Sequence, residues 1–258
     1  MELLDEIRSL SMARELRDRY ASAEPFPHIV IDDFLPTEVC EAILQEFPAP
    51  GQIPWRQFEK HYARKLASRG TSSFGEQTRE VLRQLNAAPC LRFLEELTGI
   101  ADLIPDVDFE GGGLHQIERG GFVKVHLDSN KHPRYPLARR INLLLYLNRD
   151  WRDEYRGHLE LWDEQMTRCV RSILPVFNRC VIFNTNNVSY HGHPDRLKCP
   201  PGMTRKSMAI YYYTDGRPAS ADERDHGTIW RERPSSRRAP ITVANPLRRL
   251  AASMRWRG

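Results

Sequence analysis

The chain after Pro105 carries seven short segments rich in β-branched and aromatic residues, with no helical segment between them. Glycine, asparagine, aspartate and proline separate these segments, as they commonly separate strands. A series of short strands without intervening helices predicts a sandwich, a barrel or a jelly roll. The expected strands lie near residues 108–117, 121–128, 139–147, 157–162, 168–174, 179–184 and 205–214.

The first hundred residues have a different and mainly helical pattern. Apolar residues at helical spacing predict an amphipathic helix over 2–20, a helix that begins after Pro36, and one or two helices over 75–99. One strand is expected at 28–31, and residues 52–74 show no readable pattern. We therefore expect a helical support region with one strand over 1–104, a β core over 105–218 and a basic tail over 219–258.

Length and composition are those of an ordinary globular protein. The chain has 258 residues, of which 40% are hydrophobic and 28% are charged, so it can bury a sizeable core. Its five cysteines are scattered and form no CxxC pair, which favours neither a disulfide framework nor a cysteine zinc site. The charged N-terminus lacks the apolar core of a signal peptide, and no apolar run is long enough to cross a bilayer. These features predict a cytoplasmic protein without a membrane span and leave its oligomeric state open.

Two side chains that commonly bind metals lie on the second expected strand. His126 and Asp128 are two residues apart, and alternation along a strand places such residues on the same face. A neutral imidazole and an ionised carboxylate can then reach one metal ion, if a third ligand comes from elsewhere in the fold. Two histidines and one carboxylate on one face of the ion are the ligands of non-haem Fe(II) oxygenases.

His191 is the candidate for the third ligand, because it lies just past the apolar strand over 179–184. His193, two residues further on, is the alternative, and the sequence leaves the choice between them open. A single histidine is weak evidence for a metal site. The ordered set of a His-x-Asp strand, a hairpin, another strand and a histidine is much stronger evidence.

A candidate anion site lies on the last expected strand. Arg205 opens this strand, and alternation places Ser207 on the same face. A guanidinium can bind a carboxylate through two N–H groups, and a hydroxyl beside it adds a further hydrogen bond. Tyr146, on the strand over 139–147, could donate to the same carboxylate, although it fits a tyrosine at the edge of the core equally well.

Three stretches of the sequence together resemble the prolyl-4-hydroxylase-like Fe(II)/2-oxoglutarate dioxygenases. Residues 120–128 resemble the metal-binding strand of that family. Residues 146–151 and 156–161 resemble its YLN-x-x-W … GG-x-L hairpin. His191, followed by the strand that begins at Arg205, resembles the distal metal ligand and the co-substrate anchor.

The resemblance covers about residues 107–214 and implies a double-stranded β-helix, which is a cupin-like jelly roll, with the N-terminal helices as its support. It implies an enzyme that uses Fe(II), 2-oxoglutarate and O2, with ascorbate as an optional reductant, and that hydroxylates a C–H bond while releasing succinate and CO2. The implied iron ligands are His126, Asp128 and His191, and the implied anchor for the distal carboxylate of 2-oxoglutarate is Arg205 with Tyr146 and Ser207.

The chain departs from the family pattern in two places. Arg156 takes the place of the first glycine of the Gly-Gly pair, and the segment between His191 and Arg205 is longer than is common. The loops that select a substrate carry no readable code, and likeness of fold does not fix function. The substrate is therefore left open between a small molecule, including a free amino acid, and a peptide.

Two other classes of function are compatible with parts of the sequence. The β core could be a non-catalytic metal-binding jelly-roll module, but an arginine and a serine placed for a dicarboxylate would then have no role. Residues 231–258 contain eight arginines and one glutamate, which would suit a nucleic-acid-directed oxygenase. No interleaved aromatic residues support base stacking there, so a solvated tail is the simpler interpretation and nucleic acid is not an expected partner.

Overall fold

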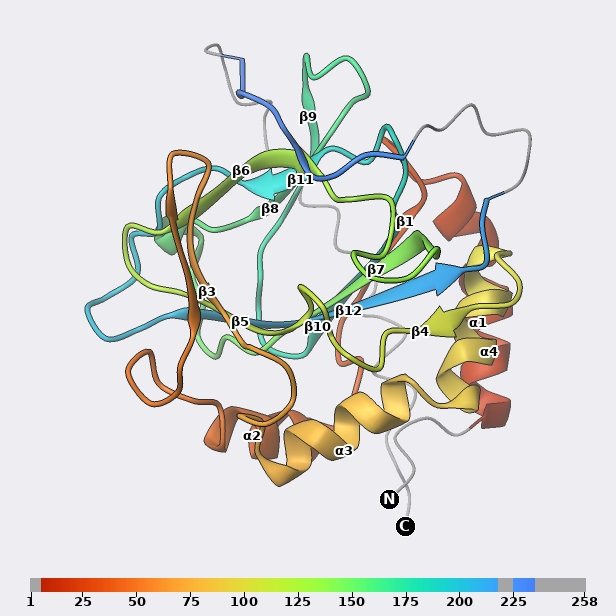
Figure 1. The fold of residues 1–258 in the computed structure, drawn as a ribbon, viewed down its shortest axis with the longest axis horizontal. Coiled ribbons are helices and arrows are strands. Elements are labelled where there is room, and N and C mark those ends of the chain that lie inside the picture. The colour runs from red at the N-terminus through yellow and green to blue at the C-terminus, as the bar shows by residue number, and fades with distance from the viewer. Residues whose placement is uncertain (1–5, 218–224, 235–258) are drawn as a thin grey trace.

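A single curled sheet of thirteen strands forms the centre of the molecule (Figure 1). The computed structural model describes residues 6–217 and 225–234. Along the sheet the strand order is β1-β10-β7-β12-β5-β3-β6-β11-β8-β9, with β13 beside β6, β2 beside β3 and β4 beside β12. The sheet curls around an interior, and the helices lie on its outer side (Figure 1). This arrangement confirms the predicted fold class, a mainly β jelly roll with N-terminal helices.

All seven strands expected after residue 105 are present. They are β5 (Gly113–Ile117), β6 (Phe122–Leu127), β7 (Ala138–Tyr146), β8 (Leu159–Trp162), β9 (Cys169–Ile173), β10 (Arg179–Asn184) and β12 (Arg205–Thr214). Only β5 begins clearly later than expected. The reason is a turn before it, in which the Asp106 carboxylate accepts hydrogen bonds from the backbone N–H groups of Asp108 and Glu110.

The predicted helices and the first predicted strand are also present. The helices are α1 (Glu6–Ala21), α2 (Thr37–Gln45), α3 (Glu76–Leu85) and α4 (Ala88–Thr98), with a 3-10 turn, η1 (Asp153–Tyr155), and the strand is β1 (His28–Ile31). Pro89 lies in the first turn of α4, where its missing N–H breaks no helical hydrogen bond. Gly99 ends α4 with a φ of 71°, a left-handed conformation that favours glycine.

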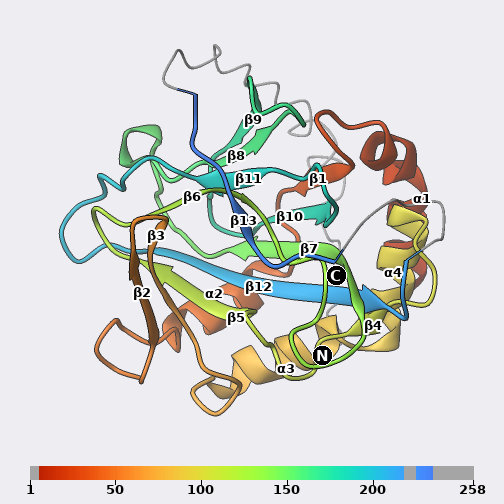
Figure 2. The ribbon, with the colours of Figure 1, turned by 45° about the horizontal axis from the view of Figure 1, so that its top comes forward.

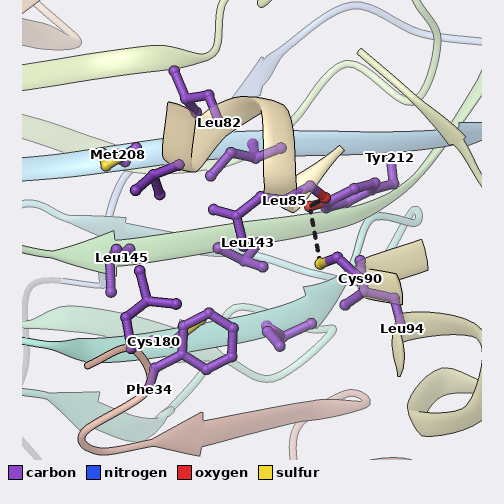
Figure 3. Close-up of a cluster of buried hydrophobic side chains, with 14 of the residues drawn as sticks. Phe34, Leu82, Leu85, Cys90, Leu94, Leu143, Leu145, Cys180, Met208 and Tyr212 are labelled. Carbon is purple, nitrogen blue, oxygen red and sulfur yellow. Dashed lines mark hydrogen bonds between the residues drawn. The ribbon is translucent and has the colours of Figure 1, made fainter. Parts of the chain in front are cut away.

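Strands β7 and β12 are buried on both faces, because helices cover their outer face and their inner face lines the interior of the curled sheet. Outward residues of both strands join one apolar cluster with residues of α3 and α4, and the Cys90 thiol contacts the Tyr212 hydroxyl there (Figure 3). The inward residues include Asn142, Tyr146, Ser207 and Tyr211, which line a cavity. Alternation along two central strands therefore divides a structural face from a polar one.

The prediction of a single strand before residue 104 is wrong. The region without a readable pattern forms a hairpin of β2 (Arg56–Lys60) and β3 (Ala63–Ala67), and β4 (Ile104–Pro105) follows at the border. Nearly every residue of β2 is exposed, so the hairpin has no apolar stripe. Backbone pairing of β3 with both β5 and β6 holds it in place instead.

Two further strands were not expected. The short β11 (His191–His193) lies between β6 and β8, and β13 (Ile229–Trp230) pairs with β6 inside the region expected to be a solvated tail. Figure 2 shows the blue segment that carries β13 crossing over β6 and β11. The rest of the expected basic tail, residues 219–224 and 235–258, lies outside the described residues. The division of the chain into three regions stays a prediction.

Candidate metal centre and ligand pocket

Strands β6 and β11 bring three potential metal ligands together. His191 lies opposite His126 in the antiparallel pairing of these strands, and Asp128 follows directly after β6. One ligand atom from each of the three residues lies within 4.8 Å of the other two. The Asp128 carboxylate is 3.3 Å from Nε2 of His126 and 3.7 Å from Nε2 of His191.

Backbone carbonyl groups orient both imidazoles. Nδ1 of His126 lies 2.9 Å from the carbonyl oxygen of Lys124, and Nδ1 of His191 lies 2.9 Å from that of Ser189. A carbonyl oxygen can only accept a hydrogen bond, so each Nδ1 carries the proton and donates it. In the neutral rings this leaves Nε2 as a lone pair directed at the cluster, as is usual for histidines that bind metals.

Electrostatics keep Asp128 ionised and His191 neutral. Burial by itself would raise the pKa of Asp128, but the neighbouring His126 and His191 rings and the charge of Arg139 outweigh burial and hold this pKa far below its usual range. Asn142 also donates a hydrogen bond of 2.9 Å to the carboxylate. Burial, followed by the neighbouring His126, lowers the pKa of His191 to about 4.

The three residues fit a metal ion better than they fit one another. A carboxylate oxygen and the lone pair of a neutral imidazole are both acceptors, so neither can hydrogen-bond to the other. A cation at their centre would be attracted by all three. Two imidazole nitrogens and one carboxylate oxygen, facing an open pocket, form the ligand set of non-haem Fe(II) sites.

The structure separates the two candidate histidines. His193 lies opposite Val123 in the strand pairing, and among the described residues it does not belong to the three-residue cluster. Its ring is buried, Nδ1 has no hydrogen-bond partner in the described part of the chain, and burial lowers its pKa well below the usual value. Geometry therefore favours His191 as the ligand and places His193 beside the site.

The predicted anion site lies in the same cavity. Arg205 is only 4% exposed; Nε donates to the carbonyl oxygen of Gly157 at 2.8 Å, and Nη2 donates to the Tyr146 hydroxyl at 3.3 Å. Ser207 lies directly opposite Tyr146 in the pairing of β12 with β7. No acidic side chain within the described ranges forms an ion pair with Arg205. A buried guanidinium without a counter-ion, beside two hydroxyl groups, fits the carboxylate of a ligand.

Gly157 is the glycine retained from the expected Gly-Gly pair, and it supports this anchor. Its φ is +79°, and a Cβ atom there would lie 2.5 Å from Leu197 Cδ2 and 3.1 Å from Arg205 Cδ. Arg156, in place of the first glycine, also has a positive φ, of 63°. With a ψ of −158°, Arg156 adopts a backbone conformation that normally requires glycine, so both positions of the turn have glycine-like conformations.

The cavity contains polar residues that sequence reasoning missed. Lys65 of β3 and Tyr211 of β12 line it together with the three potential metal ligands and Arg205. Lys65 gave no signal because the hairpin that carries it shows no strand pattern. The inward position of Tyr211 follows from its alternation with Arg205, but alternation alone does not reveal that the two residues share a cavity.

A jelly roll with two histidines and an aspartate beside a cationic pocket defines the class of non-haem iron oxygenases that use an oxo-acid co-substrate. Residues 112–213 match the family model of the 2OG-Fe(II) oxygenase superfamily. This part of the chain is similar to that superfamily, and the chain is a 2-oxoglutarate- and Fe(II)-dependent dioxygenase with a prolyl-4-hydroxylase-like fold; its co-substrates are 2-oxoglutarate and O2. The family resemblance found in the sequence is thereby confirmed.

Solved structures show the same fold at low sequence identity. A prolyl-4-hydroxylase from Pseudomonas putida matches with 18% identity and a TM-score of 0.57, over 80% of this chain and all of that one. A Trichoplax adhaerens prolyl hydroxylase in complex with a hypoxia-inducible-factor peptide matches with 16% identity and a TM-score of 0.57, over 81% and 92%. HygX from Streptomyces hygroscopicus, with nickel and 2-oxoglutarate bound, matches with 11% identity and a TM-score of 0.51, over 80% and 92%. No curated protein matches the sequence.

A membrane-spanning helix was not found in the part of the chain that the structure describes.

Proposed function

We propose that the enzyme hydroxylates a C–H bond of a small molecule or a peptide and releases succinate and CO2. In this proposal His126, Asp128 and His191 hold Fe(II), and Arg205, with Tyr146 and Ser207, holds the distal carboxylate of 2-oxoglutarate. The observation that carries the proposal is the cavity itself. It joins three converging acceptors for a cation with a buried guanidinium that lacks a counter-ion.

The bound iron and 2-oxoglutarate supply the activation of O2 and the oxidation of the substrate. The residues of the chain supply position and polarity. Asp128 stays ionised and contributes one negative charge to the metal site, while Asn142 fixes the orientation of its carboxylate. Arg205 is held by Gly157 and Tyr146 before any ligand arrives, so little side-chain entropy is lost on binding.

Asp128 also supports hydroxylation over halogenation. Halogenases of this kind lack the carboxylate ligand, so that a halide can bind the iron in its place. Here the carboxylate is present, within 4 Å of both histidines and hydrogen-bonded to Asn142. Transfer of a hydroxyl group is therefore the reaction that the ligand set supports best.

Neither of the two other classes of function that the sequence suggested is favoured by the described residues. A non-catalytic metal module would leave the anion pocket without a role. The nucleic-acid alternative rests on the arginine-rich tail, of which residues 235–258 lie outside the described residues. Peptide and small-molecule substrates both stay open: one neighbour of this fold is in complex with a peptide fragment and another with hygromycin B.

The test uses purified protein with Fe(II) and 2-oxoglutarate under anaerobic conditions. A weak metal-to-ligand charge-transfer band is expected when both are present and not with either alone. On admission of air, slow release of succinate is expected even without a substrate. Absence of both signals from correctly folded protein would overturn the proposal.

A further inference from the structure

A second, half-buried cation reaches the cavity from the hairpin. Lys65 lies on β3 between Ala63 and Ala67, which share its face of the strand and are both small and buried. Small neighbours leave room for the long lysine side chain to extend inward. Lys65 lines the same cavity as Asp128 and Arg205.

The ammonium group of Lys65 has little to bind to within the described ranges. Its recorded contact is with the ring of Phe58, whose centroid lies 5.3 Å from Nζ, and no hydrogen bond or ion pair joins Nζ to any residue that the structure describes. Burial lowers the pKa of Lys65 to about 8, with a smaller opposing effect of Asp128. The group is thus still mainly protonated at neutral pH, and a desolvated ammonium without a partner is unfavourable.

The charge of the loaded site leaves Lys65 unbalanced. Fe(II) and Arg205 contribute three positive charges, and Asp128 and doubly ionised 2-oxoglutarate contribute three negative charges, so these four sum to zero. Arg139, which lies 3.9 Å from Asp128, also interacts electrostatically with Asp106. Lys65 adds one positive charge that no acidic side chain lining the cavity offsets once the metal is bound to Asp128.

Lys65 is not placed to share the distal carboxylate of 2-oxoglutarate. Leu66 pairs with Gln116, so Lys65 lies beside Ile117, and Arg205 pairs with Ile117 from the other side. The two cations are therefore two strands apart, about 10 Å at the usual strand spacing. The guanidinium of Arg205 is turned toward Tyr146 on β7, on the side away from β3.

We propose that Lys65 binds a carboxylate of the substrate, and that the substrate is accordingly a small organic acid, such as a free amino acid or another carboxylate-bearing metabolite. This inference rests on the proposed function and narrows it. A lysine on a flexible stem suits such a role, because its ammonium acts as a point charge that adapts to the position of the acid. An internal peptide residue other than aspartate or glutamate would bring no carboxylate to this place.

The test measures the binding of matched acid and amide probes to enzyme loaded with Zn(II) and 2-oxoglutarate, since zinc prevents turnover. Hexanoate with hexanamide, and phenylacetate with phenylacetamide, are titrated by ligand-observed NMR. In the unaltered protein we expect each acid to bind at least about tenfold more tightly than its amide, as a charge-assisted contact allows. In Lys65→Met the ratio should fall to about two or less, and Lys65→Arg should restore part of the preference.

Lys60→Met is the matched control, because Lys60 lies on the other strand of the same hairpin and is exposed. It should keep the acid preference. The affinity for 2-oxoglutarate should change by less than about threefold in Lys65→Met. A tenfold loss there would instead make Lys65 part of the co-substrate anchor and would overturn the inference.

Two other results would also overturn the inference: equal binding of acids and amides by the unaltered protein, or an acid preference that persists in Lys65→Met. Failure of the proposed function would be recognised separately, because the charge-transfer band and uncoupled succinate release do not depend on these probes. A protein with both signals but no acid preference would retain the proposed function and lose only this assignment.

Discussion

The two sides of the active-site cavity are built in different ways. Strands β6, β7, β11 and β12 supply the metal cluster and the arginine anchor, and their side chains are nearly all buried. The hairpin β2–β3 and the segment around β13 lie on the other side of the cavity, where β2 is largely exposed and β13 is half-buried. Burial on both faces imposes a pattern on the first group, whereas backbone pairing and a few side-chain contacts position the second.

The two covering elements meet over the metal cluster. Tyr62, in the turn of the hairpin, stacks on Trp230 with ring centroids 4.3 Å apart, and Trp230 lies 4.7 Å from the ring of His126. Arg233 fixes the segment by ion pairs of 2.9 Å to Glu160 and 2.7 Å to Asp195. The side proposed to bind the co-substrate is therefore built from the central strands, and the side proposed to face the substrate is formed by the hairpin and the β13 segment.

If one side of the cavity binds iron and the co-substrate and the other side binds the substrate, substitutions of the metal ligands should have the largest effects. Asp128→Ala or His191→Ala should lower Fe(II) affinity by more than about 100-fold, because loss of a direct ligand should exceed the 10–100-fold effect of losing an outer partner. The charge-transfer band in an anaerobic titration measures this loss. His193→Ala is the matched control and should keep the band; loss of the band in that variant instead would exchange the roles of the two histidines.

The arginine anchor should give the next largest effect. Arg205→Ala should raise the Kd of 2-oxoglutarate by about 10- to 100-fold, the range expected for hydrogen bonds to a charged group. Tyr146→Phe and Ser207→Ala remove neutral partners and should each raise it by about 3- to 10-fold. Fe(II) affinity without co-substrate should not change in any of the three. An unchanged Kd in Arg205→Ala would show that the anchor lies elsewhere.

The difference in burial between the two sides of the cavity also explains which site residues could be predicted from the sequence. His126 and Arg205 lie on strands that were predicted, and Asp128 directly follows one, so the face of each could be inferred from the alternation of side chains along a strand. The choice of His191 over His193 depends on the pairing of β11 with β6. This pairing could not be predicted, because β11 has only three residues and none of them is β-branched. Lys65 could not be predicted, because neither strand of the hairpin that carries it alternates between polar and apolar residues, and Arg64 and Lys65 are adjacent.

A smaller effect should come from the glycine that supports the anchor. Gly157→Ala forces a left-handed φ on a residue with a Cβ atom and crowds Leu197 and Arg205, which should cost about 1–3 kcal/mol of stability. For a chain of this size the Tm should fall by about 2–9 °C, and the Kd of 2-oxoglutarate should rise a few-fold. Gly202 has a φ of +81° but no atom near the position of an added Cβ. Gly202→Ala therefore measures the effect of backbone strain alone. Equal effects of the two substitutions would exclude crowding at Arg205 as a cause.

The smallest effect should come from the contact that joins the two covering elements. A double-mutant cycle with Tyr62→Ala and Trp230→Ala should give a coupling of about 0.5–1.5 kcal/mol in the free energy of unfolding, as stacked aromatic pairs do. Uncoupled succinate release and 2-oxoglutarate affinity should stay within about twofold in both variants, because neither residue lines the cavity that holds Arg205. Acid probes should bind less tightly if the cover positions Lys65. A tenfold loss of 2-oxoglutarate affinity in Trp230→Ala would contradict the division between the two sides, since it would make the covering segment part of the co-substrate site.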